Sequence, residues 1–330
     1  NDCRSFHYKD GWSEGELCDK LTGRSLVQSR FSGCRMFQVQ KKEFLAELFG
    51  TFVLMTFGLA VNAQVSLGNA EYGDYLSINI GWGLAVVFGV YVAGGVTGAH
   101  INPAVTLALA VNRQLSWSKV LPYMAAQFIG AFVASALIYV VYLEALDHHE
   151  IIRARELIVQ QESDDLPEAS SESLAGATGK PPRTIKTAGI WATYPREFAD
   201  GSRLSNWSGF LDQVVGTALL LLCICALADE RNMAPKSNLA PLLIGAVVLM
   251  VGMSMGANCA YGINPARDLS PRVFTWLAGW GNLVFRSPNT TWYLVPILGP
   301  FLGGIIGAWL YHVMIVRWHV DSEEHPGKIT

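Results

Sequence analysis

The sequence predicts an all-α membrane protein with six transmembrane helices and two re-entrant half-helices, arranged as an inverted repeat of three plus three spans. Three observations predict this fold class: six long stretches without a charged residue, a repeated Ile-Asn-Pro-Ala motif, and a likeness between the two halves of the chain. Of the 330 residues, 51% are hydrophobic and 15% are charged. Soluble domains carry about 25% charged residues, so the composition favours a membrane protein over a soluble core of buried helices.

Stretches without Asp, Glu, Lys or Arg mark the six predicted spans. A spanning helix needs about 20 mostly apolar residues, and the shortest stretch reaches this length only by extending back through Phe210 and Leu211. The six stretches are Leu48–Ala70, Tyr75–Val111, Val120–Leu143, Gln213–Ala228, Ser237–Pro265 and Ser287–Val316.

Basic residues near the span ends predict the orientation of the chain, because short cytoplasmic loops carry an excess of Lys and Arg. They precede span 1, lie between spans 2 and 3 and between spans 4 and 5, and follow span 6, which places both termini in the cytosol. The predicted organisation is an N-terminal cytosolic segment (1–41), a channel domain (42–316) and a C-terminal cytosolic tail (317–330). The basic residues are Arg30, Arg35, Lys41, Lys42, Arg113, Lys119, Arg231, Lys236 and Arg317.

The two halves of the channel domain resemble each other, as repeat 1 (about 42–143) and repeat 2 (about 206–316), with an extracellular loop (144–205) between them. Gly50-Thr51 in the first span aligns with Gly216-Thr217 in the fourth, and the two motifs align with each other. Three spans per half is an odd number, so the halves take opposite topologies in the membrane. Inverted repeats of this kind place a functional site near the midplane, where broken helices meet. In the loop, Glu144–Gln161 could extend span 3 as a helix.

The motif residues read as two helix starts. Asn102 and Asn264 suit the N-cap, whose side-chain oxygen accepts a backbone N–H. The next residue in each motif, Pro103 or Pro265, suits the first helical position. Ala104 and Ala266 follow, and alanine is the best helix former. A lone Asn-Pro would be only a turn signal, but two in matching repeat positions predict paired half-helices.

These half-helices would enter from opposite faces and meet at mid-bilayer. The runs Pro103–Val111 and Pro265–Trp276 span about 15 Å each, half a bilayer. Non-helical backbone at membrane depth survives only inside protein or beside water, so the preceding carbonyls are expected to line a path as acceptors. The asparagine amides would face this path with free NH₂ groups, and both helix dipoles would disfavour cations there.

At this point the sequence resembles the aquaporin family, and within it the aquaglyceroporins. The resemblance covers about Lys42–Val316, apart from most of Glu144–Ile190. It is carried by "TGAHINPAVT", by "SMGANCAYGINPARDLSPRVFTWLAGWG" and by "ATYP" at Ala192–Pro195. The acid after the second motif, Asp268, is typical of the glycerol-conducting members. The resemblance implies a homotetramer in the plasma membrane.

The family position of each residue implies a selectivity filter. It consists of Trp82, Gly252, Tyr261 and Arg267. Trp82 and Tyr261 would form an apolar corner for the carbon chain of a polyol, and Arg267 would donate hydrogen bonds to its hydroxyls. Where water-selective members usually carry histidine, Gly252 would leave room. The resemblance does not fix the width of the filter at Tyr261, because many members carry Phe or a smaller residue there.

Supporting roles are expected for three further residues. Glu47 is interpreted as a buried acceptor for loop N–H groups rather than a proton relay, although its counterpart in span 4 is Gln213 rather than Glu. Asp268 is expected to hold loops that keep the filter wide, and His100 either lines the path or braces it. Asn206 and Asn289 fit the glycosylation pattern, but they lie so close to span starts that occupancy is not expected.

The function predicted is a passive channel for glycerol, water and, as a further small neutral solute, urea, which excludes ions and protons. A water-selective channel is the first alternative, and Gly252 and Asp268 argue against it. A secondary transporter is the second, although only Glu47 and Asp212 could serve as coupling residues. No metal cluster, nucleophile–base pair or phosphate loop indicates an enzyme or a cofactor, and no basic stripe indicates nucleic acid. The expected partners are small neutral solutes and the lipid bilayer.

Overall fold

A computed structural model describes residues 24–68, 71–163 and 182–319. The chain divides into two units, Asn1–Glu43 and Phe44–Thr330. The described part of the first unit is the beginning of one long helix, α2 (Arg24–Leu67), and the rest of the predicted segment 1–41 lies outside the described residues. In the second unit the described segments are helices and their connections, with an isolated antiparallel bridge between Glu197 and Arg203.

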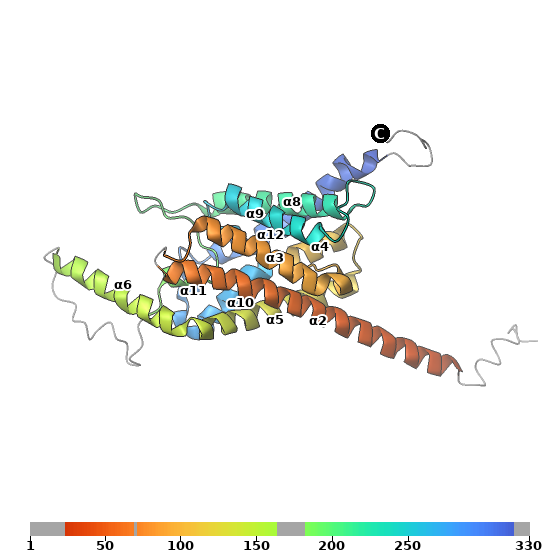
Figure 1. Cartoon of the computed structure of the whole chain (residues 1–330), viewed down its shortest axis with the longest axis horizontal. Coiled ribbons are helices and arrows are strands. Elements are labelled where there is room, and N and C mark those ends of the chain that lie inside the picture. The colour runs from red at the N-terminus through yellow and green to blue at the C-terminus, as the bar shows by residue number, and fades with distance from the viewer. Residues whose placement is uncertain (1–23, 69–70, 164–181, 320–330) are drawn as a thin grey trace, which may run out of the picture. The chain divides into compact units, whose positions relative to one another are not determined.

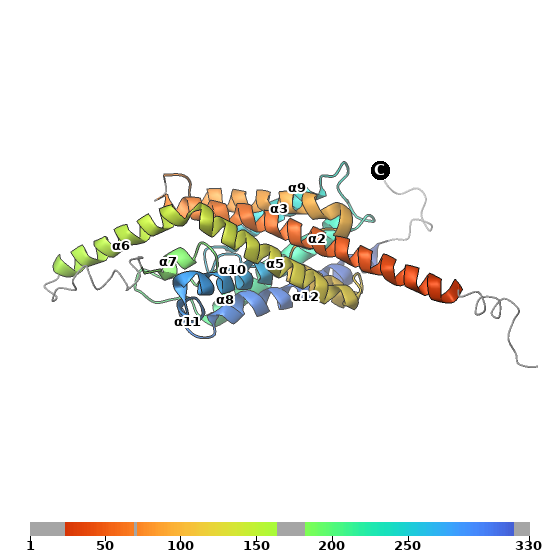
Figure 2. The same cartoon turned by 90° about the horizontal axis from the view of Figure 1, so that it is seen from below.

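The helices of the second unit follow the predicted order of span, span, half-helix, span in each half (Figures 1 and 2). After α2, the first half contains α3 (Tyr75–Thr97), α4 (Pro103–Val111) and α5 (Trp117–Val141), followed by α6 (Leu143–Ser163) and α7 (Ile185–Ala188). The second half contains α8 (Asn206–Ala228), α9 (Ala240–Met255), α10 (Pro265–Thr275), the π-helical turn η1 (Trp276–Trp280), α11 (Leu283–Arg286), the 3₁₀ turn η2 (Trp292–Leu294), α12 (Val295–Met314) and the 3₁₀ turn η3 (Val316–Trp318).

In the described part of the chain, five helical segments are long and apolar enough to cross a membrane, where the sequence predicts six spans. The exception is α9, which is apolar but has only 16 residues. At 1.5 Å per residue it is about 24 Å long, short of the ~30 Å hydrocarbon core. The helix ends at Gly256 because the chain there turns away into the non-helical approach to the second motif.

The two halves are interlocked through their half-helices. Helix α4 of the first half packs against α12 of the second, and α10 of the second half packs against α5 of the first. The spans pair across the halves as well, since α3 packs against α9, while α8 packs against α12 within the second half. Each half-helix is therefore held by the last span of the opposite half, which brings the two motifs together.

Close helix contact between α8 and α12 depends on small residues, as is usual inside membranes. A Cβ atom at Gly307 would overlap the backbone oxygen of Ala218, and one at Gly303 would overlap the backbone oxygen of Val214. The backbones of α8 and α12 touch at these points, so no side chain fits between them.

The start of α3 is fixed by a capping box. Asp74 accepts a hydrogen bond from the backbone N–H of Ser77 at 2.9 Å, and the Ser77 hydroxyl oxygen accepts one from the backbone N–H of Asp74 at 3.2 Å. Hydrogen bonds from Ser77 also lower the pKa of the Asp74 carboxyl. The carboxylate is therefore ionised at neutral pH and complements the positive end of the helix dipole.

The long connection between the halves begins with the predicted helical extension. Helix α6 follows α5 after a break at Tyr142 and continues past the end of α5 (Figure 2). Its Glu150 accepts hydrogen bonds from the backbone N–H of Thr184 at 2.9 Å and from the hydroxyl groups of Thr184 and Thr187. Asp147 forms an ion pair with Arg183 at 2.6 Å. These contacts fasten the returning chain to α6, and residues 164–181 lie outside the described residues.

Candidate functional site

Both half-helices start at an asparagine N-cap, as the motif predicts. Asn102 Oδ1 accepts the backbone N–H of Ala104 at 2.8 Å. Asn264 Oδ1 accepts those of Ala266 and Arg267 at 3.0 and 3.2 Å. In each helix a proline follows the cap, where its missing N–H costs nothing. The positive ends of both half-helix dipoles therefore lie at the motifs.

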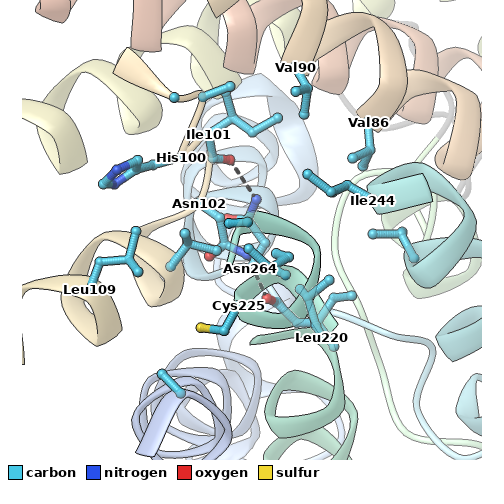
Figure 3. A pocket seen from close by; sticks show the side chains of 18 of the residues that line it. Val86, Val90, His100, Ile101, Asn102, Leu109, Leu220, Cys225, Ile244 and Asn264 are labelled. Atoms are coloured by element: carbon cyan, nitrogen blue, oxygen red, sulfur yellow. Dashed lines mark hydrogen bonds between the residues drawn. The ribbon is translucent and has the colours of Figure 1, made fainter. Parts of the chain in front are cut away.

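The two motifs are latched to each other through their asparagine amides (Figure 3). The Nδ2 atom of Asn102 donates to the backbone oxygen of Ile263 at 2.9 Å, and that of Asn264 donates to the backbone oxygen of Ile101 at 2.9 Å. The expectation that both NH₂ groups are free is therefore wrong in part, because one N–H of each is used in the latch. The sequence does not reveal this, since it does not show that each motif's carbonyl reaches the other's amide.

The carbonyls of the latch are aimed by left-handed backbone. Ile101 has φ 43° and Ile263 has φ 35°. Ala99, three residues before Asn102, and Ala260, four residues before Asn264, also have positive φ, at 55° each. A β-branched residue at positive φ is strained, and such strain persists only where the surrounding structure enforces it. Here the enforcing contacts are the hydrogen bonds on the loop.

Glu47 holds the first loop. Its carboxylate is fully buried and accepts the backbone N–H groups of His100 and Ile101 at 2.9 and 2.8 Å. It also accepts hydrogen bonds from the Thr97 hydroxyl at 2.5 Å and the Gln127 amide at 2.8 Å. This geometry is that of a structural acceptor, which agrees with the interpretation from sequence.

Gln213 performs the matching task in the second half, despite carrying no charge. Its Oε1 atom accepts the backbone N–H of Ile263 at 2.9 Å, and its Nε2 atom donates to the backbone oxygen of Ala260 at 3.0 Å. An amide can thus replace a carboxylate because one carbonyl and one N–H of this loop need partners. Gln213 departs from the family pattern, which has Glu at this position, but it still holds the loop before the second motif by two hydrogen bonds.

His100 braces the first loop and also lines a cavity of about 740 Å³. Its Nδ1 atom lies 3.1 Å from the Thr106 hydroxyl, and its ring meets the Tyr123 ring edge-on with the centroids 5.1 Å apart. The ring is buried but contributes to the cavity wall. The two roles left open by the sequence are therefore combined in one residue.

Two cavities meet at three of the predicted filter residues. One, of about 740 Å³, is lined by both motifs and by the non-helical chain before each. The other, of about 340 Å³, is lined by the segment 185–195 and the start of α3. Trp82, Tyr261 and Arg267 line both cavities. These residues therefore form the boundary between the two cavities.

Arg267 is fixed at this boundary. Its guanidinium carbon lies 4.3 Å from the centroid of the Trp82 ring, and its Nη1 atom donates to the backbone oxygen of Trp191 at 3.0 Å. Trp82 is in turn held by a hydrogen bond from its Nε1 atom to Asn62 Oδ1 at 3.0 Å. An aromatic face thus lies against a cation in a buried site, which combines an apolar wall and a hydrogen-bond donor.

The Tyr261 ring lies against Gly252. A Cβ atom at this position would lie 2.5 Å from Tyr261 Cζ and would overlap Asn79 Oδ1. The space that the missing side chain leaves is therefore filled by the Tyr261 ring. Gly252 is absent from the walls of both cavities, and Tyr261 lies against α9 at this residue.

Asp268 anchors the chain that passes over the filter. It is fully buried and accepts hydrogen bonds from the backbone N–H and hydroxyl of Thr193 at 2.7 and 2.5 Å. Its other oxygen pairs with Arg272, whose Nη2 atom lies 2.8 Å away. Arg272 also donates to the backbone oxygens of Thr193 and Val284. Arg272 is not among the site residues predicted from the sequence, although an Asp and an Arg four residues apart near a membrane span indicate a buried ion pair.

The far end of the larger cavity is lined by charged groups. Asp229 and Arg231 line it there, with the Tyr311 hydroxyl donating to Asp229 at 3.1 Å. Hydrogen bonds from Arg231 lower the pKa of the Asp229 carboxyl. At the other mouth, burial raises the pKa of Tyr194 to about 12. That hydroxyl is therefore neutral at physiological pH.

The two glycosylation candidates bind each other. Asn206 Nδ2 donates to Asn289 Oδ1 at 3.2 Å and to Thr291 Oγ1 at 2.9 Å, while Asn289 Nδ2 donates to Asn206 Oδ1 at 3.0 Å. A glycan on either nitrogen would require this pair to open.

Comparison with known proteins places these features in a family. The family model "Major intrinsic protein" matches residues 35–311. The chain is 38% identical to human aquaporin-9, over 86% of this chain and 85% of that protein, and 39% identical to mouse aquaporin-7, over 83% and 81%. It is 40% identical to aquaporin-10 of the tardigrade Milnesium tardigradum over 83% of its own length, but it spans only 63% of that protein.

The fold also matches a solved structure. The X-ray structure of the aquaglyceroporin from Plasmodium falciparum superposes with a TM-score of 0.65 and 26% sequence identity, over 84% of this chain and 98% of that one. The predicted resemblance and the predicted architecture are thereby confirmed. The interlocked half-helices, the latch between the motifs and the matched segment together show that the chain belongs to the major intrinsic protein family and has the aquaporin fold.

Proposed function

We propose that this chain is a passive channel that conducts glycerol and water, and urea as a further small neutral solute, while excluding ions and protons. The family consists of channels rather than enzymes. The observation that carries the proposal is the meeting of two cavities at Trp82, Tyr261 and Arg267. A solute there would place its carbon chain against the aromatic faces. Its hydroxyl groups would accept hydrogen bonds from the guanidinium and donate hydrogen bonds to backbone carbonyls.

Exclusion of cations follows from the charges along the proposed path. Arg267 is buried at the boundary between the cavities, and the neighbouring carboxylate of Asp268 forms its ion pair with Arg272 rather than with Arg267. The two half-helix N-termini add positive potential at the motifs. A hydrated cation would have to lose its water beside these charges, which is unfavourable, whereas a neutral polyol or water would not.

A secondary transporter is the alternative of a different class. Its two candidate coupling residues are Glu47 and Asp212. Glu47 already accepts four hydrogen bonds from the first loop and its neighbours. Asp212 accepts hydrogen bonds from Asn258 and Cys259. These contacts favour structural roles and therefore support a channel.

The proposal extends to the placement of the protein. We propose a homotetramer in the plasma membrane with both termini cytosolic, from the resemblance and from the basic residues near the span ends. We also propose that Asn206 and Asn289 pair with each other rather than carry glycans, because each already occupies the other's amide.

Stopped-flow light scattering on vesicles that contain the purified chain tests the function directly. Under a glycerol gradient the vesicles should shrink quickly as water leaves and then swell again as glycerol enters, at a rate linear in glycerol concentration and independent of added ions. Shrinkage without re-swelling would favour the water-selective channel. A saturating or ion-dependent rate would favour the transporter.

Replacing Gly252 with histidine should reduce glycerol permeability far more than water permeability. The new side chain would collide with the Tyr261 ring at its first atom, and the ring could yield only toward the passage. A barrier higher by about 1.4 kcal/mol for glycerol would slow it tenfold. Met253→His, at an exposed position on the same helix, is the control. Equal losses of water and glycerol flux in Gly252→His would contradict the assignment.

A further inference from the structure

Two buried polar atoms beside the passage lack a hydrogen-bond partner. They are the hydroxyl oxygen of Tyr261 and the Oδ1 atom of Asn79. The Asn79 side chain is 1% exposed and that of Tyr261 is 7% exposed, so neither is compensated by bulk solvent. Leaving a buried donor or acceptor unpaired is costly, and two such groups in one place call for an explanation.

The Asn79 and Tyr261 side chains both lie against the same residue, Gly252. A Cβ atom built on Gly252 would be 2.5 Å from Tyr261 Cζ and would also overlap Asn79 Oδ1. The Tyr261 hydroxyl is one bond from Cζ. A donor without an acceptor and an acceptor without a donor therefore lie near the same point, beside the backbone of Gly252 and the Tyr75 hydroxyl that donates to it.

The acceptor is held in this orientation by its own helix. Asn79 Nδ2 donates to the backbone oxygen of Tyr75 at 2.8 Å, one turn earlier on α3. Tyr75 in turn donates its hydroxyl to the backbone oxygen of Gly252 at 3.0 Å. The amide of Asn79 is thus oriented with its oxygen toward Gly252, while α3 is tied to α9 at the same residue.

We propose that Asn79 is a positioning residue for the solute filter: the two atoms are not hydrogen-bonded in this structure, and a small side-chain rotation lets Asn79 Oδ1 accept a hydrogen bond from the Tyr261 hydroxyl, which keeps the ring against Gly252 and out of the passage. This inference rests on the proposed channel function. It accounts for the hydroxyl at residue 261, which an apolar wall alone would not need. Asn79 lines neither cavity, so it would control solute choice without touching the solute.

A double-mutant cycle tests the inference in vesicles that contain the full chain. Tyr261→Phe removes the donor and Asn79→Leu removes the acceptor at similar size. Each should lower the ratio of glycerol to water permeability by about three- to tenfold, the range set by one hydrogen bond of ordinary strength. The double variant should lower it no further, and Asn79→Asp, which keeps an oxygen there, should retain most of the wild-type ratio.

Thr51→Val is the matched control, because it also removes a buried hydroxyl that lacks a hydrogen-bond partner but lies away from the cavity walls. Its permeability ratio should equal that of the wild type. Should Asn79→Leu fail to fold, Asn79→Ala replaces it in the cycle. Additive effects, or an unchanged ratio in the Asn79 variants, would overturn the inference and leave the channel function intact. A wild-type protein that passes no glycerol would instead overturn both.

Discussion

Replacing Arg267 with valine should make the channel leak protons and small cations. In a medium of effective dielectric constant near 20, a unit charge about 4 Å from an ion contributes about 4 kcal/mol to its barrier. Its removal could therefore raise cation flux by up to about three orders of magnitude. Water permeability should change little, because the cavities and the half-helix ends remain. Proton entry into vesicles loaded with a pH-sensitive dye, driven by a pH step, measures the effect.

Arg267→Lys provides the comparison for this experiment. It keeps the charge but loses the planar group that lies on the Trp82 ring and donates to the Trp191 carbonyl. It should stay proton-tight while its selectivity among polyols changes, since lysine does not reproduce guanidinium geometry. If the valine variant were as proton-tight as the wild type, Arg267 would have no guarding role, and exclusion would have to rest on the half-helix dipoles alone.

Replacing Gly307 with alanine should destabilise the fold so strongly that most of the folded protein is no longer recovered. The added Cβ atom would lie 2.7 Å from the carbonyl carbon of Ala218 and would overlap its oxygen, so α8 and α12 would have to separate. Overpacking at a backbone contact costs about 3 kcal/mol or more. The same substitution at Gly95, where a Cβ atom meets nothing within 4 Å, should leave stability unchanged or raise it, because alanine favours helix.

Recovery of monodisperse protein in mild detergent, followed by its thermal unfolding, measures both variants on one scale. The two substitutions are chemically identical and both lie in helices, so the difference between them isolates the helix contact. A Gly307→Ala protein recovered as well as the Gly95→Ala protein would show that α8 and α12 can move apart without loss of the fold.

The fold was largely predictable because its signals are repeated. The motif occurs twice, and the physical rules for N-caps and first-turn prolines specify both half-helices without further information. The helical extension after span 3 also followed from sequence. The length of α9 did not, because absence of charge marks Ser237–Pro265 as apolar but does not show that the chain leaves the helix at Gly256.

The candidate site was predictable in its residues and less so in their contacts. Trp82, Tyr261 and Arg267 do lie together, but Gly252 lies behind Tyr261 rather than beside the passage. That relation depends on which way one ring turns, and sequence spacing carries no such information. The backbone oxygens of Ile190 and Trp191 accept hydrogen bonds from Asn62 and Arg267, respectively. The sequence does not predict these contacts, because any residue type can supply a backbone acceptor.

The reciprocal latch between the motifs bears on how the protein is made. Glu47 and the loop that it holds are about 50 residues apart, so this contact can form while the first half is still being synthesised. The amide of Asn102, in contrast, waits for the carbonyl of Ile263, 161 residues later. A ribosome must therefore deliver nearly the whole chain to the insertion machinery before the centre of the protein can close, and a nascent first half stalled in the bilayer would contain a half-helix with nothing to meet.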